Sequence, residues 1–140
     1  MKRRQKVWVY SPIKSSKPPK PKVPENVKIE VETKTRELIE SFLKPNYIKP
    51  TPEDDRFNYI VEIYAKWYRS YFHFCAKYAS PGPYAISPFF ETKFAHLEYV
   101  GNSLFNLSYM RHTEQWLELF TDLSVDECLA TIKDDPHFLP

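Results

Sequence analysis

Hydrophobic and polar positions between Glu25 and Lys44 repeat with the period of an α-helix. One side of this segment is apolar and the other carries charged residues at matching intervals. The apolar positions are Val27, Val31, Leu38 and Phe42, flanked by Ile39 and Leu43. Pro45 lacks a backbone N–H and restricts the residue before it, so this pattern predicts a helix that ends at or before Lys44.

The segment 57–78 fits two periods. A helix would place Ile60, Ile63, Trp67, Tyr71 and Phe74 together on one side, which is a good amphipathic pattern. Two strands that turn near Arg69 would also separate inward from outward positions. Aromatic and β-branched residues dominate the segment and favour strands, although no Gly or Asn stands at the turn. We therefore predict a β-hairpin and keep the helix as the alternative.

Strand periodicity continues after the proline-rich loop at 80–88. Residues 90–100 alternate, and Gly101 and Asn102 suit the positive φ angles of a tight hairpin. Strands are predicted at 104–111 and 115–120, and Thr113 and Glu114 would be the two central residues of the turn between them. Ser124 and Glu127 then form the capping box of a final helix, which Asp134, Asp135 and Pro136 end.

This order of elements predicts an α+β fold. We expect an antiparallel β-meander of about four to five strands, with an N-terminal and a C-terminal helix packed on one face. The sequence divides into an extended, basic, proline-rich arm at residues 1–24 and a single α+β domain at residues 25–140.

Charge is distributed unevenly along the chain. The first 24 residues hold eight of the 20 basic residues and no acid, which leaves 12 basic residues against 18 acids in the rest. Such an arm is typical of segments that contact phosphate groups, and it also fits a merely solubilising terminus. The arm contains one apolar run, VWVY at residues 7–10, which could add a strand to the body or to a partner.

Composition also limits location and cofactors. No segment approaches the ~18 consecutive apolar residues of a membrane span, and the two cysteines do not form a disulfide framework. A cytoplasmic location with free thiols is the simplest expectation, and no cofactor is predicted. With only two glycines in 140 residues, phosphate-cradling and dinucleotide-binding glycine loops are excluded.

The stretch SYMRHTEQWLEL, residues 108–119, is the first candidate for chemistry. A two-residue turn at Thr113 and Glu114 would place four side chains on one face of the hairpin, with the Arg111 guanidinium over the Trp116 indole. The predicted recognition face comprises Tyr109, Arg111, Trp116 and Glu118. Alternation would direct Arg111 and His112 to opposite faces, so they do not form a joint catalytic pair.

The same region resembles a known family. A Ser-Pro step at Ser87 and Pro88, a mid-strand Ala95, the strand Tyr109–Arg111, Trp116 and a helix that ends in Asp-Pro are similar to a small bacterial family catalogued as a domain of unknown function. The resemblance covers about the C-terminal third of the chain. It supports the fold and implies no activity.

Two further constellations have simpler interpretations. His73 and Cys75 would share a face and could bind zinc with Cys128 or His137, but the paired short spacings of structural zinc sites are missing, so we predict no metal site. Glu91 and Lys93 have the E-x-K spacing of a magnesium-dependent nuclease superfamily, with Glu62 as the candidate second acid. Three-residue matches often arise by chance, and a solvated pair at a strand start explains this one.

The sequence therefore favours a binding module over an enzyme, and it predicts no catalytic residue. The first hypothesis is nucleic-acid binding, because interleaved cations and rings are used to hold single strands. The candidate residues are Lys2, Arg3, Arg4, Lys6, Lys66, Trp67 and Arg69. The alternatives are a protein–protein interaction module that uses VWVY and, with less support, the nuclease. Oligomeric state is not predicted.

Overall fold

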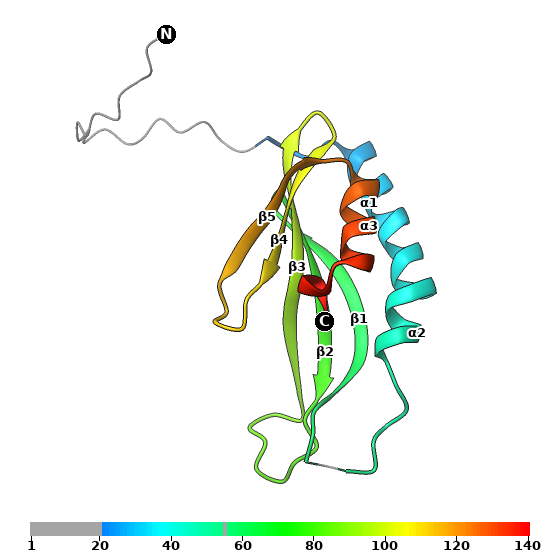
Figure 1. Cartoon of the computed structure of the whole chain (residues 1–140), viewed down its shortest axis with the longest axis vertical. Coiled ribbons are helices and arrows are strands. Elements are labelled where there is room, and N and C mark those ends of the chain that lie inside the picture. Colours follow the sequence, from blue (N-terminus) through cyan, green and yellow to red (C-terminus); the bar gives the residue numbers. More distant parts are fainter. Residues whose placement is uncertain (1–20, 55) are drawn as a thin grey trace, which may run out of the picture.

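The computed structural model describes residues 21–54 and 56–140. Along the chain, five strands lie between two longer helices, α1 and α3 (Figure 1). Short helical segments follow each of these two helices. The elements are α1 (Glu25–Leu38), a π-helical turn (Ile39–Leu43), α2 (Lys44–Tyr47), β1 (Tyr59–Tyr68), β2 (Tyr71–Ala79), β3 (Phe89–Gly101), β4 (Leu104–Met110), β5 (Trp116–Leu123), α3 (Val125–Asp134) and a 3₁₀ turn (Pro136–Phe138).

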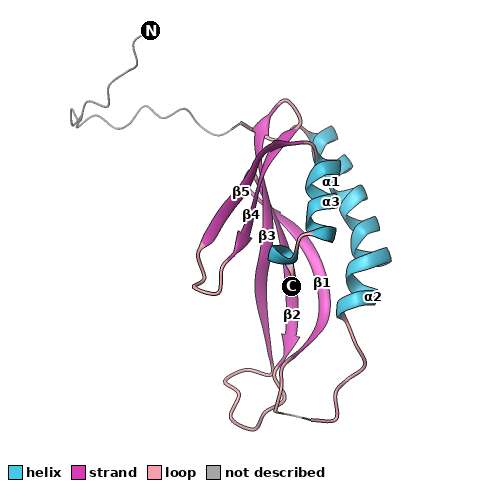
Figure 2. Cartoon of the chain, in the orientation of Figure 1, coloured by secondary structure: helices cyan, strands magenta, loops and turns pink. Residues whose placement is uncertain are grey.

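The strands form one antiparallel sheet in the order β1-β2-β3-β4-β5, so every strand pairs with its neighbour in sequence. The helices α1 and α3 lie on the same side of this sheet, and no helix of the described residues covers its other side (Figure 2). The predicted α+β meander with both helices on one face is therefore confirmed.

Strand alternation supplies the core. Phe72 and Phe74 on β2 and Leu97 on β3 point toward the helices, and all three are buried. They meet the apolar stripe of α1 and the inner side of α3. From the helices, the buried members of the core cluster are Val27, Val31, Ile39, Leu43, Val125, Cys128, Leu129 and Ile132.

Residues 59–79 form the predicted hairpin rather than the alternative helix. The strands β1 and β2 pair from Tyr59 with Ala79 to Tyr68 with Tyr71. The turn contains no glycine, and Arg69 adopts a φ of 57° in the left-handed region, which is uncommon for a long side chain. The backbone carbonyl of Ser70 accepts a hydrogen bond of 2.9 Å from the Tyr99 N–H of β3, which holds this turn against the sheet.

The predicted end of the first helix is wrong. Helical structure continues to Tyr47, past Pro45, because the turn Ile39–Leu43 is π-helical. The Lys44 N–H donates to the Ile39 carbonyl, five residues back. In a regular α-helix the Pro45 ring would clash with the carbonyl four residues before it. The wider turn that precedes Pro45 relieves this conflict, and so the chain remains helical for one more turn.

The predicted turn between the last two strands is wrong by one residue. The Glu114 N–H donates to the Arg111 carbonyl over 2.8 Å, and the Arg111 N–H donates to the Gln115 carbonyl over 2.8 Å. The loop therefore has three central residues, with Glu114 at a φ of 63°. This is the common three-residue hairpin, in which a left-handed residue follows a type I turn.

The shift changes the register of β4 and β5. Met110 pairs with Trp116, Tyr109 with Leu117, and Ser108 with Glu118. Because side chains alternate between the faces, this shift of one residue moves the side chains of residues 108–110 to the opposite face relative to their partners. A bulge between Leu107 and Ser108 ends the shift. The predicted pairing of Arg111 with Trp116 is therefore wrong.

The other predicted helix and turn signals are close to the structure. The capping box of α3 is present, with the Glu127 N–H donating to Ser124 Oγ and the Ser124 N–H donating to Glu127 Oε1. At the tip of β3 and β4 the positive φ angles extend over Gly101, Asn102 and Ser103, one residue more than predicted.

Most of the predicted basic arm lies outside the described residues. Its last residues are described, and Val23 is buried in the core cluster. Pro21 lies near Gly101, since a Cβ added to that glycine would be 3.9 Å from the Pro21 ring. The chain therefore joins the body before α1 begins.

The three-residue loop leads to a stability test. Glu114→Gly should raise the free energy of unfolding by up to about 1 kcal/mol, because glycine avoids the cost of the left-handed conformation. Thr113→Gly is the matched control and should lower it, because Thr113 has no positive φ to relieve. Urea unfolding of both variants measures the difference, and a two-residue turn at Thr113 and Glu114 would instead let both substitutions stabilise the protein.

Candidate functional site

The helix-free face of the sheet carries one row of polar side chains that crosses all five strands. Cross-strand pairing places Lys66 of β1 beside His73 of β2, His73 beside His96 of β3, His96 beside Ser108 of β4, and Ser108 beside Glu118 of β5. Directly opposite residues have Cβ atoms about 4.5–5.5 Å apart. The sheet therefore brings together a cation, two imidazoles, a hydroxyl and a carboxylate that are distant in the sequence.

A hollow of about 390 Å³ lies along this row. Its lining combines aromatic rings and imidazoles with two carboxylates and a hydroxyl. The lining residues are Tyr68, Tyr71, His73, His96, Glu98, Ser108, Trp116 and Glu118. Three of them, His73, His96 and Ser108, are buried, so the floor of the hollow is polar but removed from water. We refer to these eight residues as the open-face hollow.

Trp116 packs against both histidines. Its ring centroid lies 3.9 Å from that of His96 and 5.7 Å from that of His73, and the two imidazoles are 5.2 Å apart. Tyr71 contacts the same pair from the other side, at 4.9 Å from His96 and 5.9 Å from His73. Trp116 and Tyr71 are both only partly buried, so this aromatic group also presents ring surface at the hollow.

His73 is neutral in this environment. Its side chain is only 8% exposed, and burial lowers its pKa below the usual value, with Lys93 and Lys66 adding positive charge that lowers it further. His73 Nδ1 is buried without a hydrogen-bond partner among the described residues. A buried polar atom of this kind favours a ligand or water that can complete its hydrogen bonding.

Lysines and a carboxylate occupy the adjacent part of the open face. Glu91 Oε2 lies 2.8 Å from Lys66 Nζ and 3.9 Å from Lys93 Nζ. The hydrogen bond from Lys66 holds the pKa of Glu91 below its usual value. Burial and the neighbouring Glu91 raise the pKa values of Tyr64 and Cys75 to about 12, so both stay protonated at neutral pH.

The nuclease residues are positioned differently from the hypothesis. Glu91 and Lys93 do lie close together, but Glu62 Oε1 is bound at 3.0 Å by Lys44 of α2. Each carboxylate is thus paired with a lysine from another element. Within residues 21–54 and 56–140, no group of three or more His, Cys, Asp or Glu side chains is arranged to hold a metal ion.

The structure separates the predicted nucleic-acid-binding residues of the body. Lys66 lies on the open face, whereas Trp67 points toward α1 and packs on Phe72 at 4.7 Å. Arg69 sits in the turn, with its guanidinium 5.2 Å from the Tyr68 ring. Lys2, Arg3, Arg4 and Lys6 lie outside the described residues.

The predicted recognition face is also divided. Trp116 and Glu118 line the open-face hollow, but Tyr109 lies on the helix side, where it contacts His137 at 4.9 Å and Phe138 at 6.1 Å. Arg111 is exposed in the turn. The cause is the one-residue register shift described above, which moves Tyr109 away from Trp116.

Sequence reasoning missed most of the hollow. Tyr71, His73, His96, Glu98 and Ser108 were not proposed as one site, although their strand parity was readable. Residues 96 and 98 were correctly placed on the face opposite Leu97 and Tyr99. What the sequence lacked was the cross-strand register that sets His73 beside His96 and Trp116 above both.

Together, the fold and the hollow define a small α+β domain with a half-covered antiparallel sheet. Residues 22–140 match the family described as Domain of unknown function (DUF3024), and the chain belongs to this family. No curated protein and no solved structure matches the chain. Among the described residues, no helix combines the length and apolar character needed to cross a membrane.

The depressed pKa of His73 predicts a specific pH dependence. Below about pH 6.5 this histidine is protonated in the unfolded chain, whereas in the folded chain its lowered pKa keeps it neutral. The free energy of unfolding should therefore fall as the pH drops. In His73→Gln this fall should be smaller. Urea unfolding between about pH 7.5 and about pH 5 measures it.

His112→Gln is the control for this experiment. His112 lies exposed in the β4–β5 loop, so its substitution should leave the acid-induced loss of stability as in the unaltered chain. Equal pH dependence of His73→Gln and the unaltered chain would contradict a buried, neutral His73.

Proposed function

We propose that this domain binds single-stranded nucleic acid, with bases against the open-face hollow and phosphates held by the basic N-terminal residues. The observation that carries the proposal is the aromatic group of Trp116 and Tyr71 on a helix-free sheet face. Base stacking on such rings is tolerant of sequence and is the usual means by which a sheet surface holds a single strand.

The position of Trp116 supports a stacking role. The ring is held from beneath by His96 and His73, which fixes its orientation before a ligand arrives. Tyr68, at the opposite end of the hollow, is exposed and offers a further ring. Rings that are already ordered lose little conformational entropy on binding.

The charges in and around the hollow favour bases within it and phosphates beside it. Glu98 and Glu118 line the hollow and would repel phosphate there, but carboxylates accept hydrogen bonds from base amino groups such as that of cytosine. Phosphates would instead meet the lysines beside the hollow, Lys66 and Lys93, and the eight basic residues of the N-terminal segment. This division supports binding of unpaired bases over binding of a duplex backbone.

The nuclease alternative has weaker support. A magnesium site needs carboxylates free to coordinate the ion, and both Glu62 and Glu91 are engaged by lysines. The protein-interaction alternative rests on VWVY, which lies outside the described residues.

Trp116→Ala should weaken binding of a labelled single-stranded oligonucleotide by roughly 5- to 150-fold, the equivalent of one lost base stack of about 1–3 kcal/mol. Fluorescence anisotropy measures the change, and Trp116→Phe should restore part of the affinity. Tyr84→Ala removes a ring that is 95% exposed in the β2–β3 loop, away from the hollow, and serves as the control. Unchanged affinity for Trp116→Ala would contradict the proposed platform.

The N-terminal residues should control the salt dependence. Replacing Lys2, Arg3, Arg4 and Lys6 with glutamine in the full chain should reduce the slope of log K against log salt by up to about 3, at about 0.7 for each phosphate contact with a single strand. Binding titrations over a range of salt concentrations measure the slope. A slope equal to that of the unaltered chain would show that these four residues make no phosphate contacts.

A further inference from the structure

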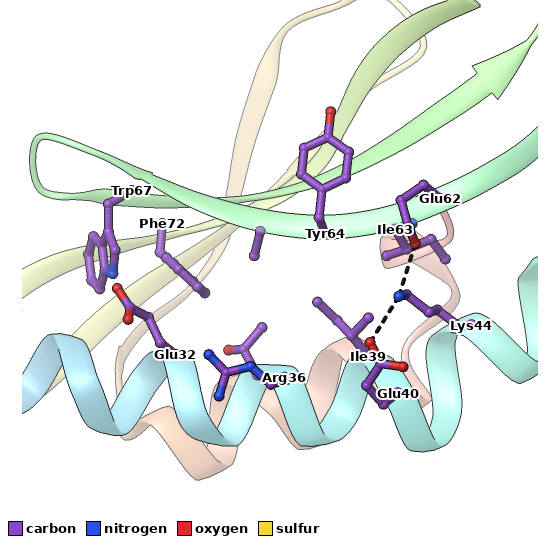
Figure 3. Close-up of a pocket in the computed structure, with 12 residues that line it drawn as sticks. Glu32, Arg36, Ile39, Glu40, Lys44, Glu62, Ile63, Tyr64, Trp67 and Phe72 are labelled. Carbon is purple, nitrogen blue, oxygen red and sulfur yellow. Dashed lines mark hydrogen bonds and ion pairs between the residues drawn. The ribbon is translucent and has the colours of Figure 1, made fainter.

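A second cavity lies between α1 and the edge of the sheet (Figure 3). It has a volume of about 350 Å³, within the range of ligand-binding clefts. Its inner surface is apolar and is formed by Ile39, Ile63, Ala65 and Phe72. Charged side chains surround the entrance, among them Glu32, Arg36 and Glu62. We call this cavity the α1–β1 groove.

Two polar atoms in the groove lack partners. Thr35 Oγ1 and Trp67 Nε1 are both buried, and neither has a hydrogen-bond partner among the described residues. Thr35 is only 2% exposed although it lies on α1 facing the sheet. Both groups can donate a hydrogen bond. The groove therefore offers two donors that a carbonyl-bearing ligand would satisfy.

The groove lies beside an edge strand. In the described part of the chain β1 pairs with β2 alone, so the groove lies at one edge of the sheet. Figure 3 shows Trp67 and Phe72 directed toward α1 and Tyr64 directed away from it. An extended peptide can lie along a groove of this kind and place alternate side chains in it.

We propose that the α1–β1 groove binds residues 7–10 of this same chain, the run VWVY. The apolar inner surface of the groove suits the Trp8 ring, while Val7 and Val9 of an extended segment would point to its other side. The carbonyl groups of that segment would accept hydrogen bonds from Thr35 Oγ1 and Trp67 Nε1. VWVY is the one apolar run of the first 24 residues, and valine, tryptophan and tyrosine favour the strand conformation.

The length of the chain permits this contact. Ten residues separate Tyr10 from Pro21, and an extended chain covers about 3.3–3.6 Å per residue, or about 33 Å in total. The described chain begins just before α1, and α1 has 14 residues, or about 21 Å at 1.5 Å per residue. The connecting residues are therefore long enough to span the whole of α1 and to reach the groove.

Charge favours the same contact. VWVY is preceded by Lys2, Arg3, Arg4 and Lys6, whereas the chain from Glu25 onward has 12 basic residues against 18 acids. Docking would place these four cations beside β1, next to the open face that carries Lys66. The docking is independent of nucleic-acid binding, and its test uses samples that contain no nucleic acid.

The test is a nuclear magnetic resonance experiment on the full chain. A spin label at Gln5→Cys should remove the indole N–H resonance of Trp67 and spare that of Trp116, which lies on the other face of the sheet. Native Cys75 and Cys128 are both buried and their pKa values are raised to about 12, so they do not compete for the label. Reduction of the label should restore the resonance.

Two substitutions make the test specific. Trp8→Ala in the labelled chain should restore the Trp67 resonance, whereas Ile13→Ala, an apolar substitution in the same segment, should leave it suppressed. A Trp67 resonance that is unaffected by the label would overturn the proposal. Suppression that appears only when label and isotope are on different copies would also overturn it, because the occupant would then be a second molecule.

Discussion

The arrangement of this domain depends on a single constraint, the alternation of side chains along strands that have helices on one face only. Phe72, Phe74 and Leu97 are buried against α1 and α3, and the residues between them must lie on the other face. A change in strand position that moved the buried apolar side chains would also move the polar side chains on the other face. The packing of their apolar neighbours therefore fixes the face of the sheet on which His73 and His96 lie.

This constraint explains how a polar site can be rigid on an exposed sheet. The histidines stand directly opposite one another on β2 and β3, and Trp116 of β5 covers both. Packing in the core already orders these strands, so the aromatic group is ordered in the absence of a ligand. The same sheet ends at β1, where α1 borders an edge strand whose apolar side is only partly filled.

The fold could be predicted from the sequence because each element has a strong local signal. The helical stripe of α1, the alternation in β3 and the capping box of α3 are all encoded within a few residues. The candidate site could not be predicted, because it depends on register between strands that are distant in sequence. The turn at Glu114 shows the sensitivity: one additional loop residue moved Tyr109 away from Trp116. Similarly, Pro45 alone indicates a helix end, and only the three-dimensional path reveals the π-helical turn before it.

That π-helical turn has a consequence for how chains of this fold can differ in length. The turn Ile39–Leu43 contains one residue more than a regular α-helical turn, yet Ile39 and Leu43 at its two ends are both buried. A chain with one residue fewer at this point, and with a residue other than proline at position 45, could form an uninterrupted α-helix with the same core contacts on either side. The first helix is thus a place where insertion or deletion of a single residue leaves the sheet undisturbed, although such changes within helices normally rotate every following side chain out of register.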